Sequence, residues 1–263
     1  TGQTEGAFGN FSRTGDVTDA AADFVRNVYS FYLQDEWRVN DRLNVVLGIR
    51  TDLFSGSRPD VNPNFALRYG FPNTTGFSDI PPVILPRFGF TYDFDDFAVF
   101  SSAQLRGGIG IFSGGDPLVW FANAFQNNGF GFAQGTSQSA NCPPGQIDVV
   151  TGGQFTGVPT CIQQDGINTA AAGLGDTQSI DPDIRMPRVL RANLGFQSDL
   201  NFTETGFFTG WRLSLDYIYS RYQNPFTIVD LSQTPDPSQG LNGFTIDGRP
   251  IYQAIDPTRA NCN

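Results

Sequence analysis

The chain has 263 residues, of which 39% are hydrophobic, 14% aromatic and only 16% charged, and its net charge is −10. Phosphate recognition needs a basic surface, so no nucleic-acid partner is expected for such an acidic chain. The complete lack of histidine excludes Ser-His-Asp and Cys-His catalysis, and no run of 18 apolar residues could form a transmembrane helix.

Six segments alternate apolar and polar residues with the period of two that is typical of a β-strand. In chain order they cover residues 28–39, 43–54, 85–94, 103–112, 189–200 and 211–222. Each has about 10–12 residues, which is the length that a tilted strand needs to cross a bilayer. A strand of a soluble sandwich is shorter, with about five or six residues. The strand length therefore favours membrane-spanning strands.

The connections between these segments alternate between short and long. Residues 40–42, 95–102 and 201–210 make short connections, whereas 55–84, 113–188 and 223–263 are long. Outer-membrane barrels have short periplasmic turns and long extracellular loops, and compact soluble domains rarely contain such loops. The pattern predicts an all-β, antiparallel transmembrane β-barrel segment in the bacterial cell outer membrane, with about six long strands.

These bounds predict how the chain is organised. An extracellular loop end (1–27) precedes strand hairpins at 28–54, 85–112 and 189–222, which alternate with extracellular loops at 55–84, 113–188 and 223–263. In the last loop, Asp247-Gly248 lies between two apolar runs and predicts a small β-hairpin. Residues 1–27 contain no apolar leader, so we expect further chain before Thr1.

In a barrel, the apolar face of each strand contacts lipid and the polar face lines a wet lumen. The predicted polar face carries charges of both signs, namely Arg50, Arg87, Arg106, Arg191 and Arg212 with Asp52, Asp93, Asp199 and Asp216. We expect ladders of ion pairs that hold the barrel wall, and a substrate path is the second interpretation. The glycines at 107, 108 and 110 lack the spacing of a nucleotide-binding loop and are expected to ease strand curvature or allow close approach.

Three cysteines occur, at Cys142, Cys161 and Cys262. The first two lie in one loop-like stretch that is rich in glycine, proline and glutamine. In an exported protein we predict that they form a disulfide and close a short loop. Cys262 is left over, so its partner is expected beyond the chain.

The long connection 113–188 also contains a group of aromatic residues. They are Trp120, Phe121, Phe125, Phe130 and Phe132. Two interpretations stay open, since aromatic loop residues can clamp a ligand or dock a partner, and they can also pack the loop on itself. Asp165, Asp176, Asp181 and Asp183 of the same connection lack the spacing of a calcium-binding loop and are expected to be solvated surface carboxylates; divalent cations that bridge them to lipopolysaccharide are the second interpretation. No metal site and no cofactor are assigned.

Residues 32–37 (YLQDEW) and 43–52 (LNVVLGIRTD) resemble a strand pair of TonB-dependent outer-membrane receptors, with the closest likeness to their Oar-like, OmpA-related branch. Residues 86–93 with 105–112 resemble the next strand pair of that branch, and 211–222 (WRLSLDYIYSRY) resembles a later strand. The likeness covers most of the chain at the level of strands, but not the loops. It implies a barrel of about 22 strands and an N-terminal plug, and neither a plug nor a TonB box occurs in this sequence.

Three functions are weighed on these grounds. The first is part of the barrel of a TonB-dependent transporter or receptor, which takes up or exports a bulky substrate. Its implied partners are outer-membrane lipid and lipopolysaccharide, the TonB system through the plug, and an unknown substrate or surface protein. The alternative is an outer-membrane barrel with a structural, adhesive or assembly role through its extracellular loops, and a secreted lectin-like module is the third. An enzyme is not expected, because no nucleophile elbow occurs either.

Overall fold

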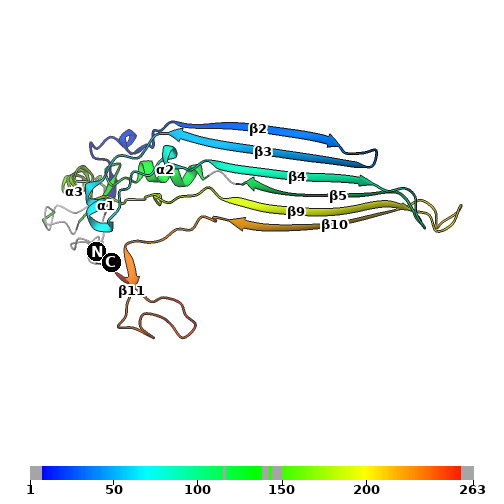
Figure 1. Ribbon diagram of the computed structural model, residues 1–263. Coiled ribbons are helices and arrows are strands. Elements are labelled where there is room, and N and C mark those ends of the chain that lie inside the picture. The colour runs from blue at the N-terminus through cyan, green and yellow to red at the C-terminus, as the bar shows by residue number, and fades with distance from the viewer. Residues whose placement is uncertain (1–7, 115–116, 138–141, 144–149, 256–263) are drawn as a thin grey trace.

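The computed structural model describes residues 8–114, 117–137, 142–143 and 150–255, and one long antiparallel sheet dominates it (Figure 1). The sheet has six strands in the order β10-β9-β5-β4-β3-β2. They are β2 (Arg26–Arg38), β3 (Leu43–Gly56), β4 (Val83–Asp93), β5 (Phe100–Ser113), β9 (Arg188–Leu200) and β10 (Trp211–Gln223). Strands that follow one another in this series pair antiparallel, so the sheet is an up-and-down meander. Within the described residues, β2 and β10 have one strand neighbour each, and the sheet is open.

The six alternating segments of the sequence lie on these six strands, and every end agrees within three residues. The largest difference is at the start of β5, where the structure begins at Phe100 and alternation begins at 103. A register shift between Ser101 and Gln104 explains it, because a β-bulge adds residues to one strand and breaks the period of two. The early part of β5 therefore belongs to the ladder although it does not continue the pattern.

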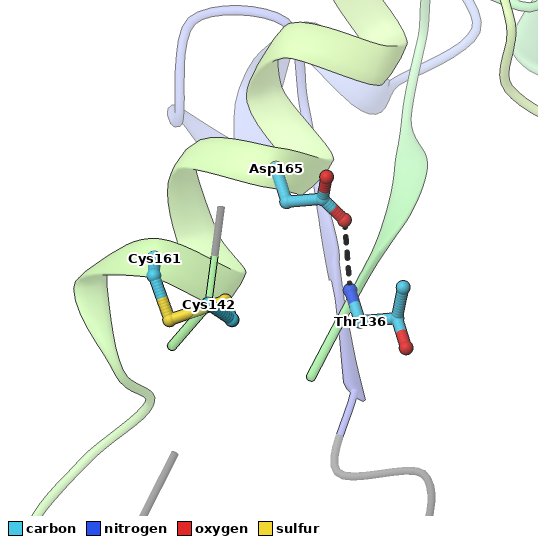
Figure 2. Close-up of a disulfide and its surroundings, with 4 residues drawn as sticks. All are labelled: Thr136, Cys142, Cys161 and Asp165. Atoms are coloured by element: carbon cyan, nitrogen blue, oxygen red, sulfur yellow. Dashed lines mark hydrogen bonds between the residues drawn. A yellow bond between two sulfur atoms is a disulfide. The ribbon is translucent and has the colours of Figure 1, made fainter. Parts of the chain in front are cut away.

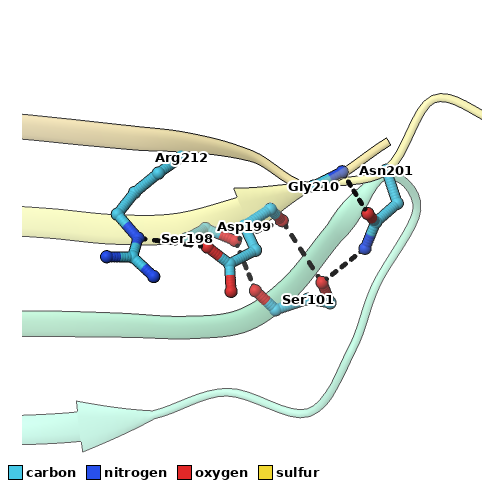
Figure 3. A network of polar contacts seen from close by, with 6 residues as sticks. All are labelled: Ser101, Ser198, Asp199, Asn201, Gly210 and Arg212. Carbon is cyan, nitrogen blue, oxygen red and sulfur yellow. Dashed lines mark hydrogen bonds and ion pairs between the residues drawn. The ribbon is translucent and has the colours of Figure 1, made fainter. Parts of the chain in front are cut away.

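Polar side chains hold this bulge at the end of the sheet that carries the short turns, called the turn end here (Figure 3). Ser102 has a φ of 50°. The buried Ser198 hydroxyl donates to the carbonyl of Ser101 at 2.9 Å, and Asn201 donates to the Ser101 hydroxyl at 2.7 Å. The N–H of Gly210 in turn donates to Asn201 at 2.9 Å. Ser198 thus satisfies the backbone carbonyl of Ser101, and the N–H of Ser102 donates to Asp96 at 3.0 Å, so backbone groups of the bulge find side-chain partners.

The long connections gather at the opposite end of the sheet, called the loop end here (Figure 1). They contain short helices and strands that alternation did not predict, so the chain is mostly antiparallel sheet with a few helices. Connection 57–82 contains α1 (Pro63–Tyr69) and η2 (Phe77–Asp79). Connection 114–187 contains α2 (Leu118–Gln126), β6 (Ala133–Thr136), β7 (Val150–Thr151), β8 (Gln154–Phe155) and α3 (Thr160–Ala171). The N-terminal part contains β1 (Phe8–Phe11) and η1 (Val17–Ala20). None of the described helices is long and apolar enough to span a membrane.

The two runs that flank Asp247-Gly248 meet antiparallel across the turn, where the sequence predicts a small hairpin, and the N–H of Thr245 donates to the carbonyl of Arg249 at 2.8 Å. A tight turn does form there, with Gly248 at a φ of 82° and the bridge Phe244↔Pro250 beside it. The run after the turn then pairs elsewhere, because β12 (Tyr252–Ala254) lies against β11 (Gln233–Pro235). The turn and its first bridge therefore follow the local signal, and the pairing of β12 with a strand more than fifteen residues upstream adds to it.

The N-terminal strand and the long connection fold together at the loop end. β1 pairs with β6, and α3 packs on β6 so closely that a Cβ at Gly135 would lie 1.9 Å from the carbonyl oxygen of Ile162. The carboxylate of Asp165 accepts a hydrogen bond of 3.0 Å from the N–H of Thr136 (Figure 2). These contacts join segments that lie over a hundred residues apart into one small β1–β6–α3 unit.

The structure contains the predicted disulfide between Cys142 and Cys161, whose Cα atoms lie 5.2 Å apart (Figure 2). Cys161 is the second residue of α3, so the bond fixes the start of that helix to the chain that follows β6. Cys142 is buried. Cys262 lies outside the described residues.

Replacing both Cys142 and Cys161 with serine should loosen α3 and leave the sheet intact. The disulfide closes a loop of 19 residues, and a cross-link of that span stabilises the folded state by about 3 kcal/mol. Amide hydrogen exchange should therefore become faster within α3, while the amides of β3, β4 and β9 keep their protection. Unchanged protection of α3 in the double variant would contradict the role given to the disulfide.

Candidate functional site

The six-stranded sheet has one apolar face. Strand register places Leu33, Ile49, Phe88, Ile109 and Tyr217 on this side. Leu33 is 73% exposed and Tyr217 is 66% exposed, although both lie in the middle of a strand. So large an exposed apolar surface is unfavourable in water at roughly 25 cal/mol per Å². The apolar face therefore needs an apolar environment.

The opposite face, called the polar face, carries linked charges. Arg50 contacts the nearly buried Asp52 at 2.8 Å, and the hydroxyl of Ser30 donates to the same carboxylate at 2.7 Å. Asp216 on β10 is reached by Arg106 on β5 at 3.2 Å. These contacts join β2 to β3 and β5 to β10, so the predicted ion pairs do tie the wall together at these positions.

A second pair on this face lies at the turn end. Arg212 contacts Asp199 at 3.4 Å, across the β9–β10 pair. Asp93 accepts a hydrogen bond of 2.8 Å from Gln104 and not from an arginine. Among the described residues, Arg87 and Arg191 form no ion pair, which departs from the predicted ladder. The guanidinium of Arg87 lies 5.5 Å from the centre of the Phe112 ring instead, as a cation–π contact.

Glycines on the polar face make room for these long side chains. A Cβ at Gly195 would lie 2.5 Å from the Asp216 carboxylate, and one at Gly48 would lie 2.9 Å from Arg87. A Cβ at Gly110 would lie 3.0 Å from the Phe112 ring. The glycines thus do allow a close approach, and in the described chain the approaching groups come from neighbouring strands at Gly195 and Gly48 and from the same strand at Gly110.

A hydrophobic core lies at the loop end, on the polar face. Val83 and Leu85 are buried there, and register places them beside Asp52 and Arg50. The remaining buried members of the core all come from the two connections, namely Phe77, Ile80, Phe121 and Met186. The connections 57–82 and 114–187 therefore fold over the polar face at the loop end, and we call them together the loop cap.

The five aromatic residues predicted as possible loop contacts have different environments. Phe121 is 1% exposed and stacks on Phe77 with ring centres 4.7 Å apart. Phe125 is partly buried and stacks on Phe24 at 4.9 Å. Trp120 is 43% exposed, and Phe130 and Phe132 are partly buried. Part of the group therefore packs the loop cap on itself, and Trp120 is available on its surface.

A buried asparagine network, which alternation could not reveal, joins the two connections of the loop cap. The side chain of Asn62 donates to the carbonyls of Asn128 and Gly173, both at 2.9 Å. Its backbone N–H donates to the side chain of Asn73 at 2.8 Å. Asn62 and Asn73 are 1% and 0% exposed. One local signal was present, since Asn62 directly precedes Pro63 and is the N-cap of α1.

A family model described as an outer membrane beta barrel domain matches residues 4–261. The chain belongs to this family. Its location is therefore the bacterial outer membrane, and lipid supplies the apolar environment that the apolar face needs. The polar face then lines the interior of the barrel. No curated protein and no solved structure matches the chain.

The described residues contain no group of three or more histidine, cysteine or carboxylate side chains placed to hold a metal ion. Several of the polar side chains described above form ion pairs and hydrogen bonds within the sheet and the loop cap. Three candidate functional surfaces remain: the polar face, the exposed part of the loop cap and the apolar, lipid-facing side of the strands.

Two neighbouring substitutions in α2 should have very different effects on the stability of the loop cap. Phe121→Ala removes a buried ring from the core and should destabilise the cap by about 3–5 kcal/mol. Trp120→Ala changes an exposed side chain and should leave the stability nearly unchanged. Hydrogen exchange of 57–82 and 117–137 measures both effects. Equal loss of protection in the two variants would show that α2 does not present these two faces.

The loop cap should also loosen in acid. Arg58 contacts Asp79 through its Nε at 2.9 Å. Burial raises the pKa of Asp79, but hydrogen bonds from Arg58 and from the N–H of Gly76 outweigh it, so the pKa lies below the ordinary value of 3.8. The ionised pair therefore stabilises the cap above about pH 4, and this contribution is lost as the pH falls through the lowered pKa. Asp79→Asn should remove the pH dependence of 57–82 between pH 5 and about pH 2, measured by exchange corrected for its intrinsic rate.

Proposed function

We propose that the chain forms part of the barrel of a TonB-dependent receptor of the Oar-like branch, which moves a bulky substrate across the outer membrane. The observation that carries this proposal is the loop cap. Its core rests on the polar face, on Val83 and Leu85, and so it stands at the entrance of the interior and not on the lipid side. A folded element at that position is suited to meet a substrate before it enters.

The proposed orientation places the loop end outside the cell and the turn end in the periplasm. Outer-membrane barrels have their long loops outside and their short turns in the periplasm. The turn of Asn40 and the bulge network around Ser101 would then face the periplasm. The aromatic residues of the turn end, including Phe207 and Trp211, would lie at the inner interface of the membrane.

Two features of the sheet support a large barrel with a hydrated interior. The polar face has paired charges such as Arg106–Asp216, which keep the wall polar without a strong local field of one sign. The outer edges of β2 and β10 are free of strand partners within the described residues. Lipid offers no hydrogen bonds to such an edge, so further strands are expected to pair with both and close the barrel.

Within the loop cap, the start of α2 is the proposed first contact for the substrate. Val119 is 68% exposed and Trp120 is 43% exposed, whereas Phe121 anchors the same helix in the core. An exposed aromatic group on a rigid helix is a common form of binding hot spot. This assignment keeps the ligand interpretation for Trp120 and the packing interpretation for Phe121.

The test compares bacteria that make the complete protein with a deletion strain, by measuring which compounds each removes from a defined medium. A substrate should disappear only in the presence of the protein, and only while the inner membrane is energised, because TonB coupling requires that energy. Trp120→Ala should weaken its binding by roughly tenfold. Val17→Ser, at a residue 84% exposed outside the loop cap, is the matched control. Identical depletion by all strains would contradict the transport proposal.

The alternative, an adhesive or assembly role, has its own supporting observation. The segment 224–255 extends away from the sheet at the loop end (Figure 1). It exposes several large apolar side chains, among them Ile228 at 72%, Leu241 at 64% and Ile246 at 96%. Exposed apolar residues of this kind mark a contact surface. If bacteria that carry Ile246→Asp no longer bind a surface partner but still remove the same nutrients from the medium, this role would be favoured over transport.

A further inference from the structure

The apolar face is almost free of charge, which makes its charged residues informative. Within the six described strands, register places three charged side chains on it: Asp35, Arg188 and Arg221. A charge on a lipid-facing strand position is disfavoured at the middle of the bilayer and tolerated near its surface. Both arginines lie at the loop end of their strands, where β9 begins and β10 finishes. The end of a strand that spans the bilayer lies near the membrane surface, where the lipid phosphate groups are.

The two arginines are neighbours on adjacent strands. Arg188 pairs with Gln223 and Arg221 pairs with Leu190, so the two side chains are diagonal on one face. Diagonal Cβ atoms on an antiparallel pair lie roughly 7–8 Å apart, a distance that one phosphate group can bridge when long guanidinium groups reach it. Ser113 pairs with Arg188 from the other side, and its hydroxyl adds a hydrogen-bond donor.

No described residue neutralises this pair. Neither Arg188 nor Arg221 forms an ion pair with the described part of the chain. The Nε atom of Arg188 is buried and has no hydrogen-bond partner among the described groups. Two adjacent like charges repel each other, and an anion bound between them relieves that repulsion. Such an anion also accepts hydrogen bonds from the guanidinium N–H groups of both arginines.

An apolar hollow on the same face leads to the arginines. Its lining includes Leu47, Ile49, Phe88, Ile109 and Leu190, with Asp35 of β2 on the side away from the arginines. Leu190 is in register with both Ile111 and Arg221, so one end of the hollow lies directly beside the charged group. The face thus combines an apolar groove with a cationic end, which is the arrangement that matches an acyl chain attached to a phosphorylated headgroup.

We propose that β5, β9 and β10 form a binding site for one phosphate-bearing membrane lipid. Its phosphate lies between Arg188 and Arg221, with Ser113 and Gln223 as further polar partners, and one acyl chain fills the hollow. In the orientation of the proposed function, the loop end faces the outer leaflet, so the lipid is lipopolysaccharide. Only this choice of leaflet rests on the proposed function; the phosphate site rests on the outer-membrane location and on strand register.

The test measures the lipid that stays with the complete protein when it is purified from outer membranes in mild detergent. Mass spectrometry gives the amount of lipopolysaccharide and of glycerophospholipid per protein. Substituting Arg188→Gln together with Arg221→Gln should lower the retained lipopolysaccharide by at least roughly tenfold, because two charge-assisted contacts are lost. Arg212→Gln, on the polar face of β10, is the matched control and should retain the lipid. Equal retention in all three proteins would overturn the proposal.

A second pair of variants tests the hollow without changing any charge. Ile109→Trp should fill it and reduce retention, whereas Leu215→Trp, on the apolar face outside the lining of the hollow, should not. Tight binding of inorganic phosphate, seen by NMR, with no effect of Ile109→Trp would overturn the acyl-chain part. Arginine-dependent retention of glycerophospholipid alone would keep the phosphate site and overturn the proposed leaflet. Because none of these readouts depends on transport, a failure of the uptake test leaves them unaffected.

Discussion

The hydrocarbon of a membrane cannot hydrogen-bond with a peptide group, and the rest of this structure depends on that constraint. Every strand must satisfy its backbone with its neighbours, so the chain runs up and down in a single antiparallel ladder from β2 to β10. Where the ladder is interrupted, at the bulge near Ser101, the hydroxyl of Ser198 binds the backbone carbonyl of Ser101, and Asn201 holds the Ser101 side chain. The interruption lies at the turn end and not in the middle of the sheet.

Because alternate residues of each strand point to opposite faces, the sheet has one apolar face and one polar face. Apolar side chains on one face require lipid, and the charges on the other face pair across strands, as Arg106 does with Asp216. Long arginines need space on a flat sheet, and glycines such as Gly195 provide it. On the polar face, long side chains therefore lie across glycine positions, where no side chain of the strand itself takes up the space.

At the loop end, a buried core stabilises the chain, as it does in a soluble protein. The loop cap has its own small core around Phe77 and Phe121 and its own buried hydrogen bonds from Asn62. A buried amide without partners is costly, so this network fixes one arrangement of the two connections. A preorganised cap loses less conformational entropy when a ligand binds than a flexible loop does. This combination of a rigid entrance and a polar interior is what makes transport the preferred proposal.

The sequence by itself determined the main sheet and its environment. Alternation is a local property, because a strand with one lipid face must repeat every second residue, and strand bounds were off by three residues only where the bulge at 101–104 broke the period. The pairing of Cys142 with Cys161 was also predictable, since both lie in one short stretch. The tertiary structure alone decided the loop cap, the pairing of β11 with β12, and the neighbouring positions of Arg188 and Arg221. Each of these depends on contacts between distant residues, such as the bond from Asn62 to Gly173 across 111 positions, and no local periodicity encodes such a contact.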